Sequence, residues 1–433
     1  MKKNWRGVQV SAVTLAAWTI FPAPVLALPL LAQTTFGGAG DELGTGVAAN
    51  SSGVFFSGAG PAGNQGVVGQ YGSSLGPSAV WSRSPSDPAA FQGVALTGNG
   101  VVTAGWSYSH TVDTVGSKEF KGITVLFNAD GSMGGGVGGS VWARQTPGAP
   151  GGFPYGGFEF LTGVVTASEA GQSRIYAAGL GQPGFSGDLG RFVTKYDESG
   201  NILWTRSDTT TIVHAASSTL WDTRTTGIAA TGDSLYVASR SENSGVHPDL
   251  KKYDPDGNLL WSRTSAAAGE YRSVTSADGK VYAVGQTNPD TANPDFLIES
   301  WDAAGNLLWS KTYGRNSAQD ILNGVVFQGG HLFAVGSTKG NTAGGTDGIL
   351  LEIDALTGDL LDSTLWGGAA DDSFNGVAIA GSTLYAVGST RSFGAGGSDI
   401  GIAAFDVQGA PEPGTLALAA IGLLALGGRR SGR

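Results

Sequence analysis

The sequence predicts an all-β fold built from seven copies of one four-stranded unit. Glycine accounts for 72 of the 433 residues, whereas charged residues account for only 14%. The glycines separate many short apolar runs that are rich in Val, Leu, Tyr and Phe, which is typical of strands joined by tight turns. Two phrases alternate along the chain, and this alternation indicates a repeat architecture.

The first phrase is a turn between two strands. It is clearest in YDESGNILWTR (196–206), YDPDGNLLWSR (253–263) and WDAAGNLLWSK (301–311), and weaker in IDALTGDLLDS (353–363) and FNADGSM (127–133). The aspartate side chain caps such a turn, and the glycine adopts the positive φ that the turn requires.

The second phrase is a pair of short strands joined by a glycine turn. It reads NGVVFQGGHLFAVGST at 323–338 and NGVAIAGSTLYAVGST at 375–390, and five further copies begin near residues 45, 92, 162, 226 and 272. Together the phrases give four strands per unit. Seven such units at a period of about 46–70 residues predict a seven-bladed β-propeller. The small residues that open each copy suit the crowded strand nearest the axis.

The ends of the repeat region predict how the ring closes. The seventh copy ends at DIGIAAFDVQGA without an outer strand, whereas QTTFGGAGDELGTGVA (33–48) matches STLWGGAADDSFNGVA (363–378). We therefore expect residues 33–37 to supply the missing outer strand of the last blade, which removes open sheet edges. The chain has no cysteine, so an exported form must be stabilised by its core and by closure rather than by disulfides.

Residues 1–32 have the layout of a secretory signal peptide. Three basic residues come first, and a mostly apolar run follows at 8–21. Pro22 ends this run after about fourteen residues, which is short of the roughly 20 that a membrane-spanning helix needs. Ala27 and Ala32 are both small enough to precede the cleavage site, so the sequence leaves both positions open.

Residues 410–433 combine three features in order: a proline–acid–proline triplet, a short apolar run and terminal arginines (Pro411, Glu412, Pro413, Arg429 and Arg430). This arrangement resembles the PEP-CTERM sorting signal of Gram-negative bacteria. The resemblance implies transient association with the inner membrane through the apolar helix, until an exosortase reads the triplet and removes the tail. It also implies a secreted or cell-surface protein in a setting of extracellular polysaccharide and biofilm.

These boundaries leave residues 33–409 as the propeller. The two ends hold six of the 25 basic residues but only one of the 35 acidic residues, so the part between them has a net charge of about −15. An acidic surface disfavours binding to nucleic acid.

The alternating phrases resemble the seven-bladed β-propeller (SBBP-type) repeat of bacterial surface proteins, over roughly residues 33–408. The resemblance implies a binding or scaffold role, with a polysaccharide or a surface protein as partner. One segment, LLEIDALTGDLL (350–361), instead resembles a quinoprotein-type blade. The alternative function is a propeller enzyme: a polysaccharide lyase or hydrolase, or a quinoprotein-like dehydrogenase. A third alternative is a purely structural surface-layer component, which would bind no ligand.

One turn is a weak calcium candidate. Asp254, Asp256 and Asn258 place oxygen ligands at alternate positions, which suits Ca²⁺. The downstream glutamate of a calcium loop is missing, however, and the sister turns keep only the first aspartate and the glycine. Turn chemistry is the preferred interpretation, and no other cofactor is expected.

The sequence identifies no catalytic residue. The pairs Asp371–Asp372 and Asp41–Glu42 could serve in acid–base chemistry, but they fall at matching repeat positions. GAGPAG (58–63) fits a dinucleotide-binding pattern but lacks a following helix. Tryptophans such as those at 204, 261 and 309 fall in strands, and we expect them in the core.

Variable loops are the better candidates for binding. Three loops join the second and third strands of their blades, and we expect them on one face: residues 286–295, 337–347 and 389–399.

Overall fold

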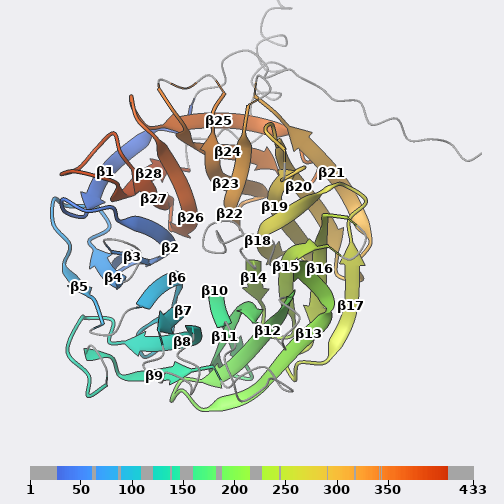
Figure 1. The fold of residues 1–433 in the computed structure, drawn as a ribbon, viewed down its shortest axis with the longest axis horizontal. Helices are drawn as coiled ribbons and strands as arrows, with labels where there is room; N and C mark the ends of the chain where they lie inside the picture. Colours follow the sequence, from blue (N-terminus) through green and yellow to red (C-terminus); the bar gives the residue numbers. More distant parts are fainter. Residues whose placement is uncertain are drawn as a thin grey trace, which may run out of the picture.

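The computed structural model describes residues 27–60, 65–85, 89–108, 120–136, 139–146, 159–181, 188–214, 227–242, 245–289, 291–315, 318–340, 342 and 344–407. Their strands form seven four-stranded antiparallel sheets around a central axis (Figure 1). The predicted all-β, seven-bladed propeller is therefore confirmed. Across these same residues, no helix has the length and apolar character to cross a membrane.

Six blades follow one another along the chain, each with its first strand nearest the axis (Figure 1). Blades 1 to 3 comprise β2 (Leu43–Asn50), β3 (Gly53–Ala59), β4 (Gly66–Tyr71), β5 (Trp81–Arg83); β6 (Ala89–Leu96), β7 (Val101–Tyr108), β8 (Phe120–Phe127), β9 (Trp142–Gln145); and β10 (Glu159–Glu169), β11 (Gln172–Gly181), β12 (Asp188–Asp197), β13 (Ile202–His214). Blades 4 to 6 comprise β14 (Gly227–Ala230), β15 (Leu235–Ser241), β16 (His247–Tyr253), β17 (Leu259–Thr264); β18 (Gly269–Ala277), β19 (Lys280–Thr287), β20 (Phe296–Asp302), β21 (Leu307–Tyr313); and β22 (Asp320–Gln328), β23 (His331–Thr338), β24 (Asp347–Asp354), β25 (Leu360–Trp366).

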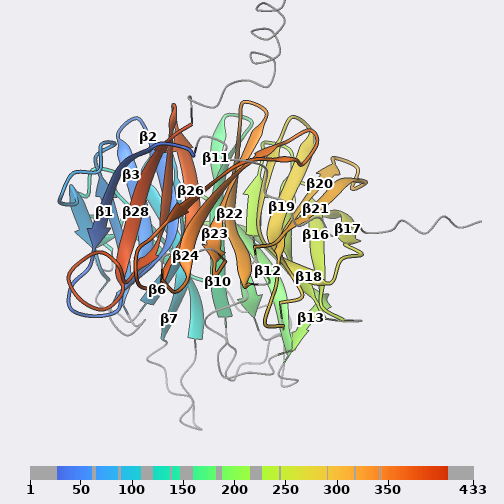
Figure 2. The same ribbon diagram turned by 90° about the horizontal axis from the view of Figure 1, so that it is seen from above.

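Blade 7 joins the two ends of the propeller. Its inner strands are β26 (Asp372–Ala380), β27 (Thr383–Thr390) and β28 (Asp399–Asp406), and its outer strand is β1 (Leu30–Phe36). β1 runs antiparallel to β28, with Gln33 opposite Ala403 (Figure 2). The expected closing strand is confirmed, and it begins earlier than the predicted residues 33–37.

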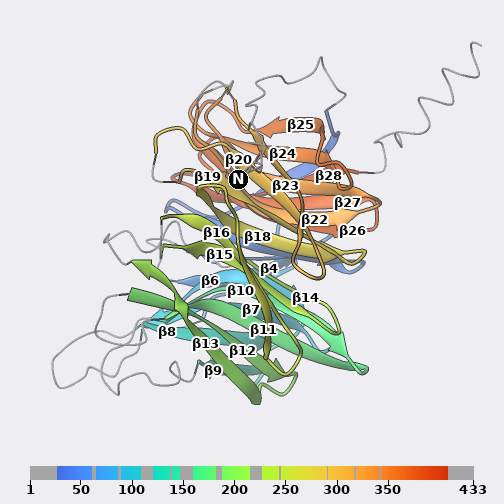
Figure 3. The ribbon, with the colours of Figure 1, turned by 90° about the vertical axis from the view of Figure 1, so that its right-hand side faces the viewer.

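The antiparallel strands run between two opposite faces of the ring (Figures 2 and 3). One face, here called the loop face, carries the connections between second and third strands and those between consecutive blades. The other, the turn face, carries the turns between first and second strands and between third and fourth strands. The loops at 286–295, 337–347 and 389–399 all belong to the loop face, as expected.

The core is divided among the seams between blades. Each of the seven seams has its own cluster of buried apolar side chains. Between blades 6 and 7, for example, Trp366 stacks on Phe374 with ring centroids 4.6 Å apart, and Phe374 meets Phe405 edge-on. Burying each such side chain contributes about 1.5–3 kcal/mol, so each blade depends on its neighbours.

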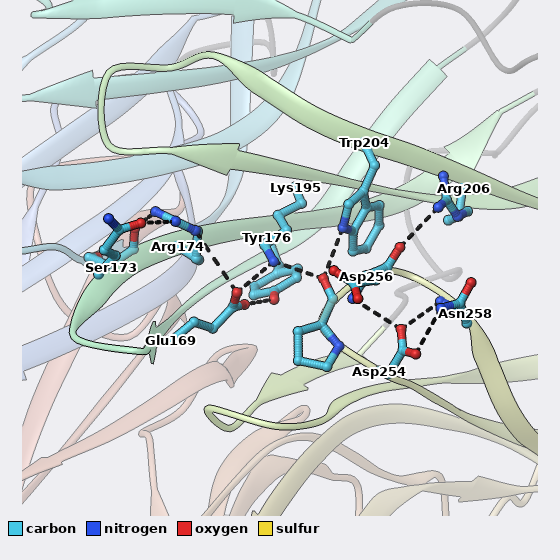
Figure 4. A network of polar contacts seen from close by, with 12 residues as sticks. Glu169, Ser173, Arg174, Tyr176, Lys195, Trp204, Arg206, Asp254, Asp256 and Asn258 are labelled. Carbon is cyan, nitrogen blue, oxygen red and sulfur yellow. Dashed lines mark hydrogen bonds and ion pairs between the residues drawn. The ribbon is translucent and has the colours of Figure 1, made fainter.

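The outer strands add a second contact between blades, here called the Trp–Arg latch. Trp204 Nε1 donates a hydrogen bond to the Pro255 carbonyl at 3.0 Å (Figure 4). Arg206 Nε donates to the Gly257 carbonyl at 3.1 Å. Both acceptors lie in the turn of the next blade. The Arg206 guanidinium also lies over the Trp204 ring at 5.4 Å. The same contacts recur from Trp142 and Arg144 and from Trp261 and Arg263.

The latch explains why its acceptor turn contains glycine. Gly257 has a φ of +80°, and a Cβ there would lie 3.0 Å from the Arg206 side chain. Gly200 has a φ of +78°, and a Cβ there would lie 2.7 Å from Trp142. Glycine is thus required both by the backbone and by the indole above it. The tryptophans expected in the core therefore lie at the outer seams, where Trp204 is half-buried.

Candidate binding cavity in the central channel

The first strands carry a repeated bulge that faces the channel. In six blades the pairing of first and second strands skips one residue, directly before the small residue that opens the second phrase. A bulge re-aims the side chain of the skipped residue. The skipped residues are all polar and all line the channel: Thr45, Gln92, Thr162, Arg272, Asn323 and Asn375.

Several of these side chains form a belt of hydrogen bonds around the axis. Asn323 Nδ2 donates to the Phe374 carbonyl at 2.9 Å, and Asn375 Nδ2 donates to the Gly44 carbonyl at 2.8 Å. Thr45 Oγ1 donates to the Phe91 carbonyl at 2.7 Å. In each case the acceptor directly precedes the bulged residue of the next blade. The belt therefore holds adjacent blades in register at the channel wall.

The glycines after the bulges allow this close approach. A Cβ on Gly376 would lie 3.2 Å from the Gly46 Cα, and a Cβ on Gly46 would lie 3.0 Å from the Gly93 Cα. These distances are tight for a real Cβ atom, so larger side chains would push the blades apart. The expected preference for small residues near the axis thus has a direct steric cause.

The belt surrounds a cavity of about 490 Å³. Its lining comes mainly from the beginnings of the first strands, such as Leu43 and Ser373, and from Ser337 near the end of β23. The cavity therefore occupies the half of the channel nearest the loop face. Trp106 and Phe160 form an edge-to-face aromatic pair in its wall, with ring centroids 6.1 Å apart.

Arg272 is the one charged residue among the described residues that line the cavity. Its Nε donates to Oε1 of the buried Glu270 at 2.8 Å, and its Nη1 donates to Asn323 Oδ1 at 3.2 Å. Gln286 Nε2 donates to the same oxygen of Glu270 at 2.8 Å. The guanidinium is thus held rigidly at the cavity wall.

Gln92 differs from the other bulged residues. Its side chain lines the cavity, and it makes no hydrogen bond to any residue that the structure describes. An amide offers two donors and an acceptor to a ligand. The cavity therefore presents amides, hydroxyls, a guanidinium and an aromatic pair, a combination suited to binding a polyhydroxylated molecule.

The acid pairs that the sequence singled out lie outside this cavity. Asp371 Oδ1 accepts the backbone N–H of Thr346 at 2.8 Å, and Asp41 Oδ1 accepts that of Ser398 at 2.8 Å. Thr346 and Ser398 belong to loop-face loops of the preceding blade. The first acid of each pair therefore clamps a neighbouring loop.

The second acid of each pair stabilises its own turn. Asp372 accepts the backbone N–H of Gly368 at 2.9 Å and the hydroxyl of Ser392 at 2.6 Å. Glu42 accepts the N–H of Gly38 at 3.4 Å. The repeat thus gives all four acids a structural role.

The calcium candidate lies in the turn between β16 and β17 (Figure 4). Asp254 Oδ1 accepts the N–H groups of Asp256 and Asn258 at 3.0 and 2.8 Å, and Oδ2 accepts Asn258 Nδ2 at 2.8 Å. These hydrogen bonds, led by that of the Asn258 side chain, lower the pKa of Asp254. Asp302 and Asn306 repeat the arrangement, which supports the turn interpretation. Within the described residues, no cluster of three His, Asp or Glu side chains suits a metal ion.

The glycine-rich segment at 58–63 does not precede a helix. It begins at the end of β3, and the next strand is β4; Gly60 donates its N–H to the Gln65 carbonyl at 2.5 Å. Residues 61–63 lie outside the described residues. The strand-to-helix turn of a dinucleotide site is therefore not formed here.

The sequence predicts the loops but not the bulged residues of the belt or the Trp–Arg latch. The sequence nevertheless contains a repeated pattern for each of these features. A polar residue precedes the small residue in every copy, as TG, QG, TG, TG, RS, NG and NG, and the latch recurs as WSR, WAR, WTR and WSR. Their meaning depends on bulges and on neighbouring blades, which one strand's pattern does not reveal.

Solved structures with a similar fold are distant in sequence. The polysaccharide lyase Uly1 is 13% identical, with 85% of this chain and 90% of that chain covered and a TM-score of 0.48. The subtype N10 neuraminidase-like protein of A/little yellow-shouldered bat/Guatemala/060/2010 is 7% identical, with 87% and 98% covered and a TM-score of 0.42. Similarity at this level carries no argument about activity. No curated protein matches the chain.

The C-terminal residues named in the sequence, Pro411, Glu412, Pro413, Arg429 and Arg430, lie outside the described residues. Their segment, residues 410–431, matches the family model of the PEP-CTERM protein-sorting motif. The resemblance noted in the sequence is therefore confirmed. This chain is a seven-bladed β-propeller that carries a PEP-CTERM motif, and the motif implies export, sorting to the cell surface or beyond, and processing by an exosortase.

Proposed function

We propose that this protein binds a polysaccharide at the bacterial cell surface or in the extracellular matrix, as a non-catalytic propeller. The observation that carries the proposal is the composition of the cavity wall. Amides, hydroxyls and a fixed guanidinium match the hydroxyl groups of a sugar, and Trp106 and Phe160 offer apolar surface to a sugar ring. The loop face extends this surface through the three loops at 286–295, 337–347 and 389–399.

Catalysis is the competing function. A lyase or hydrolase needs an acid or base within hydrogen-bonding reach of its substrate. The described lining residues include no Asp, Glu, His, Lys or Tyr, and the nearby Glu270 is held by Arg272 and Gln286. These observations favour binding over acid–base chemistry at this cavity.

A glycan array probed with the exported, purified protein tests the proposal, with parallel arrays run in a chelator. We expect specific binding to acidic or neutral glycans that the chelator leaves unchanged. Loss of binding in the chelator would instead support a Ca²⁺ site at Asp254, Asp256 and Asn258. Absence of binding across the array would contradict the proposal and direct attention to a surface-protein partner.

A matched pair of variants locates the site. Gln92→Ala should weaken glycan binding by about 5- to 30-fold, because it removes one or two hydrogen bonds to the ligand. Gln172→Ala, an exposed change on the turn face, should leave binding unchanged. Release of new reducing ends or unsaturated sugars from the bound polysaccharide would establish the enzymatic alternative.

A further inference from the structure

The segment before β1 is part of the fold. The Leu28 side chain is only 4% exposed and packs between blades 6 and 7, in the cluster that contains Trp366 and Phe405. The carbonyl of Pro29 accepts the backbone N–H of Asp406 at 3.0 Å. Ala27, in contrast, is exposed. The packed part of blade 7 therefore begins at Leu28.

Cleavage of the signal peptide after Ala32 would remove this packed segment. Leu30 lies opposite Phe405 in the β1–β28 pairing, and Ala32 lies opposite Ala404. A chain that starts at Gln33 would lose both pairings and the buried Leu28 side chain. It would keep only the second half of the strand that closes the ring.

The sequence around Ala27 also fits a signal peptidase better. The enzyme selects small side chains directly before the cleaved bond and two positions earlier. For cleavage after Ala27 the earlier position is Val25, whereas for cleavage after Ala32 it is the larger Leu30. Ala27 also lies closer to the end of the apolar run at Phe21.

A buried carboxylate faces the start of this segment. Asp362 in β25 occupies the place of the latch tryptophan, because GDLLDS aligns with GNLLWS of the preceding blades. Its side chain is buried, and Oδ1 accepts the N–H of Ser363 at 2.6 Å. Oδ2 is buried, and no described residue lies at a distance and angle that would form a hydrogen bond with it.

The backbone N–H of Leu28 is the group that approaches this carboxylate from blade 7. Burial raises the pKa of Asp362, and the nearby backbone N–H groups of Ser363 and Leu28 act against that rise. Across the sheet, Asp362 pairs with Glu352, whose carboxylate is already 2.8 Å from His331 Nδ1.

We propose that signal peptidase hydrolyses the Ala27–Leu28 bond and that the new Leu28 ammonium pairs with Asp362. Water adds across the peptide bond, so Ala27 leaves with a carboxylate and Leu28 gains an amine where its amide nitrogen now lies. An exposed α-amino group has a pKa of about 7.7–8.0, and the adjacent carboxylate of Asp362 favours the protonated form of this amine. Processing thus supplies a cation to a buried acid and completes the last seam, independently of any ligand.

Mass spectrometry of the protein exported by a Gram-negative host tests the cleavage. We expect the N-terminal peptide to begin at Leu28, and a start at Gln33 would overturn the proposal. Ala27→Val should leave the signal peptide attached, because valine is too large directly before the cleaved bond. The matched change Ala32→Val should leave processing unchanged; the reverse pattern would assign the cleavage to Ala32.

Thermal unfolding tests the ion pair. Asp362→Asn should lower the Tm of the processed chain by several degrees more than it lowers the Tm of the uncleaved Ala27→Val chain, which has no ammonium at Leu28. Asp278→Asn, an exposed change in the β18–β19 turn, should leave both Tm values unchanged. If Asp362→Asn lowers the Tm of the processed chain and of the uncleaved Ala27→Val chain by the same amount, the Leu28 ammonium and Asp362 do not pair.

Discussion

The seams between consecutive blades differ from the seam that closes the ring. In blades 1 to 4, each outer strand reaches the next blade with a tryptophan and an arginine that hydrogen-bond to carbonyls of a turn. In blade 6 the tryptophan position holds Asp362, and closure relies on Trp366, whose Nε1 donates to Gln33 Oε1 at 2.8 Å. A repeat can reuse one latch along the chain, but the closing contact must join residues more than 300 positions apart.

The closing seam should be the more sensitive to mutation. Trp366→Ala removes a fully packed ring and the hydrogen bond to Gln33, and it should lower the free energy of unfolding by about 3–5 kcal/mol. Trp261→Ala removes a half-exposed latch ring and should cost about 1–3 kcal/mol. Urea unfolding of both variants measures the difference, and equal losses would contradict a special role for the closing seam.

Two glycines of similar φ distinguish the contribution of the latch to the free energy of unfolding from the contribution of backbone strain. Gly257→Ala should lower the free energy of unfolding by about 2–4 kcal/mol, because a Cβ strains the turn and crowds the Arg206 and Trp204 side chains of the latch. Gly279 has a φ of +72° with no atom within 4 Å of the added Cβ, so Gly279→Ala should cost only about 1 kcal/mol. If the two variants unfold at the same urea concentration, the latch makes no contribution.

Asp320, the first residue of blade 6, lies at the seam between blades 5 and 6 and should make the free energy of unfolding depend on pH. Burial raises the pKa of Asp320 to about 6, whereas hydrogen bonds from Thr338 and the Arg315 backbone act against that rise. The folded chain therefore holds the proton more tightly than the unfolded chain, where the pKa is about 3.9. Between about pH 4 and pH 6 the free energy of unfolding should fall by about 2 kcal/mol as pH rises.

Asp320→Asn should remove that part of the pH dependence. Unfolding curves at pH 4, 5, 6 and 7 for the wild type and the variant isolate it, because the other carboxylates contribute equally to both. If the free energy of unfolding changes with pH by the same amount in both proteins, the pKa of Asp320 is not raised in the folded chain.

The loop clamps should have the smallest effect. Asp371 is exposed and accepts one backbone N–H, from Thr346, so Asp371→Asn should cost about 0.5–1 kcal/mol. Hydrogen exchange should nevertheless quicken at the N–H of Thr346. Unchanged exchange there would show that the loop is held by other contacts.

The fold was largely predictable because each blade repeats the same local chemistry. Asp254, Gly257 and Asn258 form the turn that their spacing indicates, and the likeness of residues 33–48 to 363–378 revealed the closing strand. The cavity was not predictable to the same extent. Gln92 and Arg272 point into the channel because a bulge shifts them out of the strand's alternation, and that shift depends on pairing with the second strand.

Hydrogen exchange with and without the polysaccharide of the producing cells tests the binding cavity most directly. We expect protection at the beginnings of the first strands that line the cavity, at residues 43–47, 92–94, 319–325 and 373–377, and loss of this protection in Gln92→Ala. Binding that protects only the outer strands, or protection that Gln92→Ala leaves intact, would contradict the assignment of the central cavity as the binding site.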